Sequence, residues 1–358
     1  MSFIDAVALL NKQVPDAIFD LTAKSVVDFP HISTGSFVID YITGIGGLPR
    51  GRITELHGLQ SSGKTTCALM AAAECQDLGL AVHYQDYEHS IDPKYAATLG
   101  VKFDPTRWGI SQPSSMEEGF RIAKFLMEQS GGTLGMIICD SVAAMATLQD
   151  RSHEVGETQI GTQASVMSLS LRQMKECIDK YQVAWVFINQ LRDIVDLSWA
   201  GQQAARQGPK KTTPGGSALK FYADLRLEFI PTGQEKVEQA GLFGEDKRKV
   251  VVGQRARVTA VKNKCAAPFK SEEIFIRHGK GIDSTVPCIE LAVKFGLISS
   301  GARGGYFKIP EPYCDPAYKE QTVQGKENLV QFFEQNEPLL QILFNDVWKC
   351  MINPSIAT

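Results

Sequence analysis

The sequence predicts an α/β fold with a mostly parallel, twisted sheet that helices cover on both faces. Short apolar runs typical of buried strands alternate with helix-like runs between Ile53 and Ile188, which is the pattern of a parallel sheet. Three of the strand-like runs end in polar residues, and such sheets bind ligands at the carboxyl ends of their strands. A glycine-rich stretch beginning at Gly58 follows the first run. The predicted core therefore binds a ligand at one edge of its sheet.

Length and composition limit the class of protein. The chain has 358 residues, of which 44% are hydrophobic and 22% charged, as in an ordinary globular protein. No apolar run reaches the roughly 18 residues of a membrane span, and no secretion signal opens the chain. We therefore expect a cytoplasmic protein without a membrane partner. Its eight cysteines lack paired spacing, so we expect reduced thiols without zinc or a disulfide framework.

The chain is expected to divide into three parts, because single hydrophobic cores stop growing near about 250 to 300 residues. Residues 1–31 begin with apolar residues at helical spacing and predict an N-terminal helical arm, which packs either on its own domain or on a neighbouring subunit. Residues 32–283 contain the predicted core. Helix-like runs after residue 284 predict a small C-terminal α/β domain covering residues 284–358.

Residues Gly58–Thr65 have the pattern G-x-x-x-x-G-K-T between a strand-like run and a helix-like run. Glycines let backbone amides turn inward around phosphates, and the start of the following helix adds the positive end of its dipole. Lys64 would reach the β- and γ-phosphates, and the Thr65 hydroxyl would hold Mg²⁺. A chance match in an unrelated loop is the alternative, but strand before and helix after are the context that the motif requires. The chain is therefore expected to bind a nucleoside triphosphate.

Polar residues at the ends of later strand-like runs would complete this site. Glu88 could take a proton from the water that attacks the γ-phosphate. Asp140 ends a buried apolar run, where a carboxylate supports the Mg²⁺ shell, and Gln190 could sense the γ-phosphate through its amide. For Glu88 the alternative is a solvated loop carboxylate, and for Gln190 it is an ordinary polar side chain.

Two stretches favour a polymeric phosphate partner. Residues 191–214 are rich in Gln, Gly, Ala and Lys and precede glycines at a helix start, as in a functional loop or one that orders on binding. Residues 247–270 contain basic side chains and no acidic one, the charge expected where nucleic acid binds. Within them Arg255 and Arg257 would share one face of a strand. An ordinary surface insertion and a solvated charged face stay open as alternatives.

Four further strings stand in a fixed order after the phosphate loop: Ile137–Ala144 (IICDSVAA), Phe187–Arg192 (FINQLR), Gly215–Tyr222 (GGSALKFY) and Val261–Lys270 (VKNKCAAPFK). With them the chain closely resembles the bacterial RecA family of DNA strand-exchange recombinases, from about Ile32 to the C-terminal helices. The resemblance implies a P-loop NTPase core of the RecA type. It also implies an ATP- and Mg²⁺-dependent protein that forms helical filaments on single-stranded DNA, pairs it with homologous double-stranded DNA and hydrolyses ATP at subunit interfaces.

The resemblance also assigns nucleotide roles. Glu88 matches the catalytic glutamate, acting with Lys64 and with Gln190 as γ-phosphate sensor, while Thr65 and Asp140 match the magnesium site. The positions expected to bind the nucleotide are Gly58, Leu59, Gln60, Ser61, Ser62, Gly63, Lys64, Thr65, Thr66, Asp92, Tyr95, Lys262, Lys264 and Pro268. Of these, Asp92 and Tyr95 match the adenine site, and the last three match residues that reach the ATP of the adjacent subunit.

DNA roles follow in the same way. Residues 154–161 resemble the first DNA-binding loop, with Ile160 at the position of an apolar side chain wedged between bases, and residues 191–214 resemble the second loop. Arg257 matches the site for the incoming duplex. The positions expected to contact the backbone of the primary strand are Ser168, Arg172, Arg192, Gly215, Gly216 and Ser217.

The chain departs from the family pattern in several places. The second loop is longer, Ser165 stands where an arginine is usual, and Ile230 and Pro231 replace arginines of the second DNA site. These differences suit a divergent or phage-encoded member. Two other functions remain as alternatives: a hexameric DNA motor of the same core fold, and a regulator that binds ATP without hydrolysing it.

Overall fold

The computed structural model describes residues 29–152, 161–193, 211–239, 248–301 and 305–352, together with Asp5, Leu10 and Lys12. Most of the predicted N-terminal arm lies outside the described residues. So do residues 154–160 and 194–210 of the two expected DNA loops, including Ile160. These parts of the expectation stay predictions.

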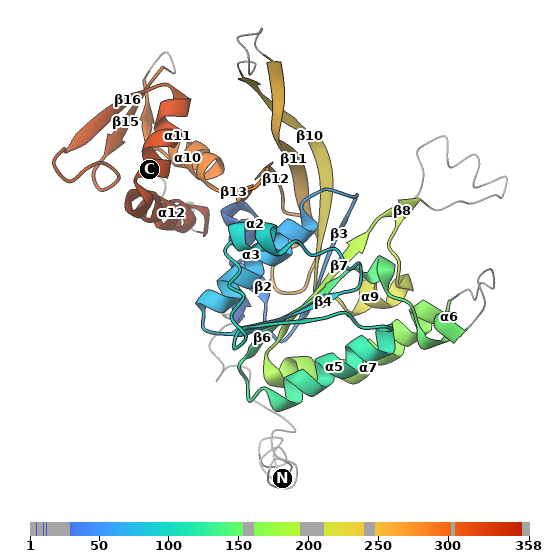
Figure 1. The fold of residues 1–358 in the computed structure, drawn as a ribbon. Helices are drawn as coiled ribbons and strands as arrows, with labels where there is room; N and C mark the ends of the chain where they lie inside the picture. The colour runs from blue at the N-terminus through green and yellow to red at the C-terminus, as the bar shows by residue number, and fades with distance from the viewer. Residues whose placement is uncertain are drawn as a thin grey trace.

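A nine-stranded sheet forms the centre of the molecule, with the strand order β13-β12-β11-β10-β3-β7-β6-β4-β5 (Figure 1). Five of its eight neighbouring pairs are parallel, and the three pairs from β10 to β13 are antiparallel. The prediction of a mostly parallel sheet is therefore confirmed. Its strands are β3 (Ile53–Gly58), β4 (Ala81–Asp86), β5 (Trp108–Ser111), β6 (Leu134–Asp140), β7 (Ala184–Gln190), β10 (Leu225–Gln239), β11 (Arg248–Asn263), β12 (Ser271–Arg277) and β13 (Gly281–Asp283).

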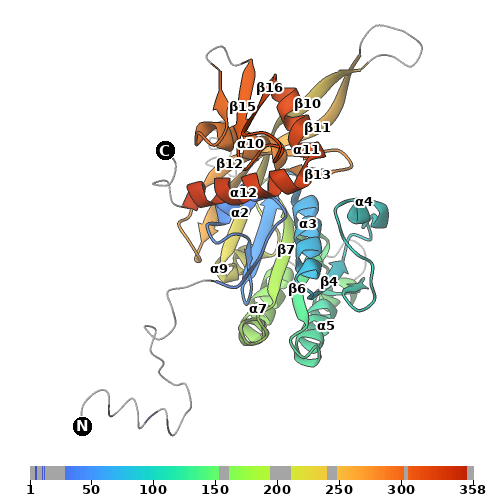
Figure 2. The same cartoon turned by 90° about the vertical axis from the view of Figure 1, so that its left-hand side faces the viewer.

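Helices cover both faces of this sheet because its central strands are apolar on both sides. On β6, Met136 and Ile138 belong to one buried cluster, whereas Ile137 and Cys139 belong to the other, as the two-residue period of a strand requires. The first cluster lies under α2 (Phe37–Thr43) and α3 (Lys64–Asp77), and the second under α5 (Met116–Gln129), α7 (Thr162–Tyr181) and α9 (Gly216–Tyr222) (Figures 1 and 2).

Shorter elements connect these layers. They are β1 (His31–Ile32), β2 (Leu48–Pro49), α4 (Pro93–Thr98), the 3₁₀ turn η1 (Val142–Ala144), α6 (Leu148–Ser152), β8 (Arg192–Asp193) and β9 (Lys211–Thr212). Within the described ranges, no helix is both long enough and apolar enough to cross a membrane.

A third buried cluster belongs to the C-terminal part of the chain. Phe37 of α2 packs against Phe344 and Trp348, with ring centroids 5.6 Å apart in both pairs, and Figure 2 shows α12 lying across α2. The predicted domain division at residue 284 stays a prediction. The elements of this C-terminal part are α10 (Thr285–Lys294), β14 (Ser299–Ser300), β15 (Tyr306–Pro310), β16 (Glu320–Gln324), α11 (Lys326–Gln335) and α12 (Glu337–Ile352).

Strand β10 was not predicted, because Pro231 and Gly233 are typical strand breakers. The structure accommodates them in two ways. β10 pairs with β3 only from Leu225 to Phe229, so Pro231 lies beyond that pairing and has a strand partner only on the β11 side. The register with β11 then shifts between Pro231 and Gly233, as at a β-bulge. Beyond this point β10 and β11 continue as a ribbon that projects from the sheet (Figure 1).

Two buried histidines predict an acid-sensitive core. Burial lowers the pKa of His83 from 6.5 to about 4, and that of His57 to about 4 as well. Below pH 6.5 these histidines therefore bind protons in the unfolded chain but stay neutral in the folded chain. The free energy of unfolding thus decreases as the pH falls from 6.5 toward 4. Asp40 acts in the opposite direction, because burial raises its pKa to about 7.

Replacing His83 with Gln is expected to weaken this acid sensitivity. Glutamine can keep a hydrogen bond to Ser111, whose Oγ lies 3.0 Å from His83 Nε2, but it does not titrate. Between pH 6.5 and pH 5 the wild-type free energy of unfolding should fall by about 2 kcal/mol more than that of the variant. Urea unfolding at both pH values measures the difference. If the free energy of unfolding falls equally in the wild type and the variant, His83 binds a proton in the folded state over this pH range.

Candidate nucleotide-binding site

The phosphate loop joins the carboxyl end of β3 to the start of α3, as predicted. Glycine is required at two of its positions. A Cβ on Gly58 would lie 2.1 Å from the Phe229 carbonyl oxygen, and one on Gly63 would lie 2.3 Å from Ile276. Gly63 also has a φ of 93° as the N-cap of α3, a conformation that favours glycine. The loop can therefore turn its amides inward only with the residues that the motif provides.

Lys64 lies inside this loop rather than in solvent. Its Nζ donates to the Leu59 carbonyl oxygen at 2.6 Å and to Ser62 Oγ at 3.3 Å. Burial lowers the pKa of Lys64 to about 8, while the nearby carboxylates of Asp140 and Glu88 act in the opposite direction. The amine is therefore held between the loop and two acidic groups, where it would meet a triphosphate.

The two expected magnesium-site residues are in contact. Thr65 Oγ1 donates to Asp140 Oδ2 at 2.9 Å, and the hydroxyl of Tyr84 donates to the same oxygen at 2.7 Å. Burial raises the pKa of Asp140, and these two hydrogen bonds oppose that effect. A hydroxyl and a carboxylate are the hard oxygen ligands that Mg²⁺ prefers, and Mg²⁺ takes its remaining ligands from phosphates and water. The donor set therefore fits Mg²⁺.

No group of three or more His, Cys, Asp or Glu side chains that could hold a metal ion occurs in the part of the chain that the structure describes.

Glu88 and Gln190 meet at the carboxyl edge of the sheet. Gln190 Nε2 donates to Glu88 Oε1 at 3.2 Å, and the Ser141 hydroxyl donates to the same oxygen. The turn that carries Glu88 is held by Asp86, whose carboxylate accepts from the backbone N–H groups of Ser90 and Ile91. Three strand ends, those of β4, β6 and β7, thus converge beside the phosphate loop, as the sequence predicted.

A cleft of about 300 Å³ opens over this loop. Tyr95 lines it, and its hydroxyl lies 2.8 Å from Thr66 Oγ1. Asp92 does not line the cleft. Instead it caps α4 by accepting from the N–H groups of Lys94 and Tyr95, so it positions Tyr95. The other lining residues are Ser61, Ser62, Gly63, Lys64, Thr65, Thr66, Gln254, Ile276, Arg277, His278 and Gly279.

The far wall of the cleft comes from β11, β12 and the turn after β12. The sequence predicts strands over Val250–Val261 and Glu272–Ile276, but it did not assign their residues to the nucleotide site. Gln254 donates a hydrogen bond to the carbonyl oxygen of Ser61 in the phosphate loop. Arg277 forms ion pairs with Asp283 at 2.6 Å and with Glu334 of α11 at 2.9 Å. Arg277 thus lines the cleft and, through its guanidinium, contacts the C-terminal part of the chain.

Lys262, Lys264 and Pro268 do not line the cleft of their own chain. Lys262 Nζ donates to the carbonyl oxygens of Lys220 and Phe221 at the end of α9, both at 2.8 Å, and burial lowers its pKa. Lys264 pairs with Asp224 at 3.1 Å. The predicted role of these residues at the ATP of an adjacent subunit stays a prediction.

The expected contacts to the primary DNA strand come from neighbouring elements. Ser168 and Arg172 lie on the exposed face of α7, and α9 packs against this helix so closely that a Cβ on Gly216 would lie 2.5 Å from the Ala164 side chain. Gly215 donates its N–H to Gln163 of α7 at 3.2 Å. Ser217 is exposed on α9, and Arg192 is exposed on β8, which pairs with β9 just before α9. Arg257 is also exposed but lies apart from them, on β11.

The basic run is less one-sided in the structure than in the sequence. Arg255 pairs with Glu235 of β10 at 2.9 Å and with Glu273 of β12 at 3.3 Å. The pairing of Lys264 with Asp224 removes a further unpaired charge. Acidic side chains that are distant in the sequence thus offset part of the positive charge of residues 247–270. Arg255 and Arg257 do share one exposed face, as predicted.

The chain is similar to known proteins over most of its length. A family model described as RecA N-terminal domain matches residues 3–283. Protein RecA of Aquifex aeolicus (strain VF5) is 38% identical over 324 residues, which cover 90% of this chain and 85% of that protein. Protein RecA of Chlorobaculum tepidum is 40% identical over 336 residues, covering 93% and 88%. A solved structure titled crystal structure of the RadB recombinase has a TM-score of 0.47 and 19% identity, covering 70% of this chain and 98% of that chain.

The family model and the relatives together extend over both the phosphate loop and the strand-end residues described above. They confirm the predicted fold class and the predicted class of activity, an ATP-dependent DNA strand-exchange recombinase. The chain belongs to the RecA family.

Proposed function

We propose that this chain binds ATP with Mg²⁺, assembles as a helical filament on single-stranded DNA and hydrolyses ATP while it exchanges strands with homologous double-stranded DNA. The observation that carries the proposal is the convergence of Glu88, Gln190 and the Thr65–Asp140 pair beside the phosphate loop. A base, a γ-phosphate sensor and a metal site at one sheet edge are the parts that triphosphate hydrolysis needs.

Each side chain of the site has a distinct task in this proposal. Lys64 would exchange its bond to the Leu59 carbonyl oxygen for phosphate oxygens. Thr65 and Asp140 would hold Mg²⁺, which offsets the charge of the phosphates when bound. Glu88 would accept a proton from the attacking water. Because Gln190 donates to the same carboxylate, its amide would report the presence of the γ-phosphate to the residues that follow it.

The arrangement of the basic residues supports a nucleotide shared between subunits. Lys262 lies at the end of β11 that pairs with Arg226, and Lys264 follows that end, whereas Gln254, which lines the cleft, lies near the middle of the strand. Lysines outside their own cleft would reach the ATP of a neighbouring copy. Filament assembly and ATP binding would then be linked.

Electron microscopy and ATPase measurements test the proposed function. With ATP, Mg²⁺ and single-stranded DNA we expect open helical filaments and faster ATP hydrolysis than without DNA, and ADP in place of ATP should not support them. Closed rings would instead indicate a hexameric motor. Stable ATP binding with no hydrolysis on DNA would indicate a regulator.

A further inference from the structure

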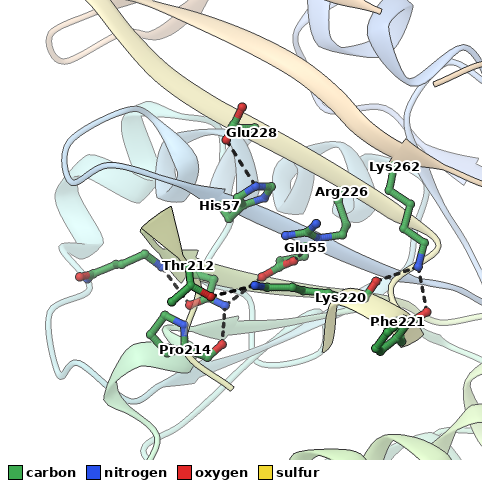
Figure 3. A network of polar contacts seen from close by, with 11 residues as sticks. Glu55, His57, Thr212, Pro214, Lys220, Phe221, Arg226, Glu228 and Lys262 are labelled. Carbon is green, nitrogen blue, oxygen red and sulfur yellow. Dashed lines mark hydrogen bonds and ion pairs between the residues drawn. The ribbon is translucent and has the colours of Figure 1, made fainter. Parts of the chain in front are cut away.

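A buried amide on β7 contacts both the nucleotide edge of the sheet and the start of α9. Asn189 is fully buried, and its Nδ2 donates to Glu55 Oε1 at 2.9 Å. The other carboxylate oxygen of Glu55 accepts from Arg226 Nε at 2.5 Å. Figure 3 shows this network around Glu55. Both oxygens of a fully buried carboxylate are thus occupied, which fixes the orientation of the Asn189 amide, since a buried unpaired charge is costly.

The same amide has two further partners. Asn189 Nδ2 also donates to the carbonyl oxygen of Pro214 at 3.1 Å, and its Oδ1 accepts from the backbone N–H of Gln190 at 3.0 Å. Gln190 contacts Glu88, and Pro214 precedes Gly215, the N-cap of α9. One side chain therefore connects the proposed γ-phosphate sensor with the glycines proposed to bind DNA.

Helix α9 is held at its other end by a residue that is also assigned a nucleotide role. Lys262 donates to the carbonyl oxygens of Lys220 and Phe221, and Lys220 Nζ donates to Thr212 Oγ1 at 2.9 Å (Figure 3). The helix thus lies between two polar contacts, one to the nucleotide edge of its own chain and one to a lysine proposed to serve the neighbouring chain.

We propose that Asn189, oriented by Glu55, is a positioning residue that transmits the nucleotide state at Gln190 to the start of α9, an inference that rests on the proposed function. If the backbone of Gln190 shifts when its side chain meets a γ-phosphate, the hydrogen bonds of Asn189 to the Gln190 N–H and the Pro214 carbonyl oxygen would carry that shift to Pro214. The DNA-facing glycines would then differ in position between the ATP-bound and ATP-free states. Because such coupling is reciprocal, DNA must change nucleotide affinity by the same factor.

The test compares Asn189→Ala with a matched control, Gln76→Ala. Gln76 is also a fully buried amide whose two ends bond backbone groups, with Nε2 2.7 Å from the Lys102 carbonyl oxygen and Oε1 2.8 Å from the Lys102 N–H. It lies far along α3 from the strand ends. The affinity for a fluorescent single-stranded oligonucleotide is measured with and without Mg²⁺ and adenosine 5′-(β,γ-imido)triphosphate, and nucleotide affinity is measured with and without DNA.

In the wild type the nucleotide should raise DNA affinity by a definite factor. Asn189→Ala is expected to reduce this factor at least about fivefold, the lower range of typical coupling, and to leave DNA affinity without nucleotide unchanged. Gln76→Ala should keep the factor. If Asn189→Ala fails to fold, Asn189→Ser, which is too short to bridge Glu55 and Pro214, takes its place.

Three results would overturn the inference or what it rests on. If Asn189→Ala keeps the full factor, the amide is structural only. If Gln76→Ala loses it equally, general destabilisation explains the effect. If the wild type itself shows no nucleotide-dependent DNA affinity, the proposed function fails, and the inference fails with it.

Discussion

Replacing Glu88 with Gln is expected to abolish ATP turnover while ATP binding persists. Glutamine keeps the size of the side chain and can still accept from Ser141 and Gln190, which both donate to Glu88 Oε1. It cannot take a proton from water. Since a positioned base typically contributes about 10² to 10⁴ in rate, DNA-stimulated phosphate release should fall by at least about 100-fold. The unhydrolysed ATP should keep the filament on DNA.

The control for this variant is Glu128→Gln, which neutralises a surface carboxylate that pairs only loosely with Lys124, at 3.8 Å. Its turnover should match the wild type. Phosphate release measures hydrolysis, and a fluorescent ATP analogue measures binding. Normal turnover in Glu88→Gln would refute the assigned role, and loss of nucleotide binding would show that the carboxylate holds the site together instead.

Replacing both Lys262 and Lys264 with Ala is expected to have the second-largest effect, a loss of ATP-dependent assembly. Hydrogen bonds to charged groups are worth about 1.5 to 3 kcal/mol each, so losing two contacts to a neighbour's ATP should raise the protein concentration needed for assembly at least about tenfold. The monomer should stay folded, because the carbonyl oxygens that Lys262 leaves lie beside the exposed Phe221 and can bond to water. Light scattering with ATP and single-stranded DNA measures assembly.

A double variant that removes two other surface lysines, Lys102→Ala with Lys124→Ala, controls for the loss of charge. Both lysines are more than half exposed and pair with acidic residues on the surface. This control should assemble normally. Unchanged assembly in the Lys262 and Lys264 variant would mean that ATP is not shared across a subunit interface.

The nucleotide edge could be predicted because its signals are local. The phosphate loop carries its chemistry in eight consecutive positions, Gly58–Thr65. Asp140 and Gln190 each follow a buried strand, and parallel strands bring their carboxyl ends to one edge. The order of the strands along the chain is therefore enough to predict that these residues lie together. In the structure, Asp140 contacts Thr65, and Gln190 contacts Glu88.

The other half of the site depends on long-range packing. Tyr84 lies within a buried strand and has the pattern of a core residue, yet its hydroxyl donates a hydrogen bond to Asp140. Gln254 and Arg277 line the cleft only because β11 and β12 join the sheet beyond β10. The sequence did not predict β10, because Pro231 is a typical strand breaker. The charge of Arg255 was misjudged for the same reason, since its partners Glu235 and Glu273 come from flanking strands.

The position of Arg277 has a mechanical consequence. Arg277 is a residue of the cleft wall, and its guanidinium forms an ion pair with Glu334 of α11. Moving α11 away from the core would break the Arg277–Glu334 ion pair, which links a residue of the cleft wall to the C-terminal elements. A nucleotide in the cleft would therefore lie beside a residue that is also paired with α11, although the C-terminal helices do not line the cleft themselves.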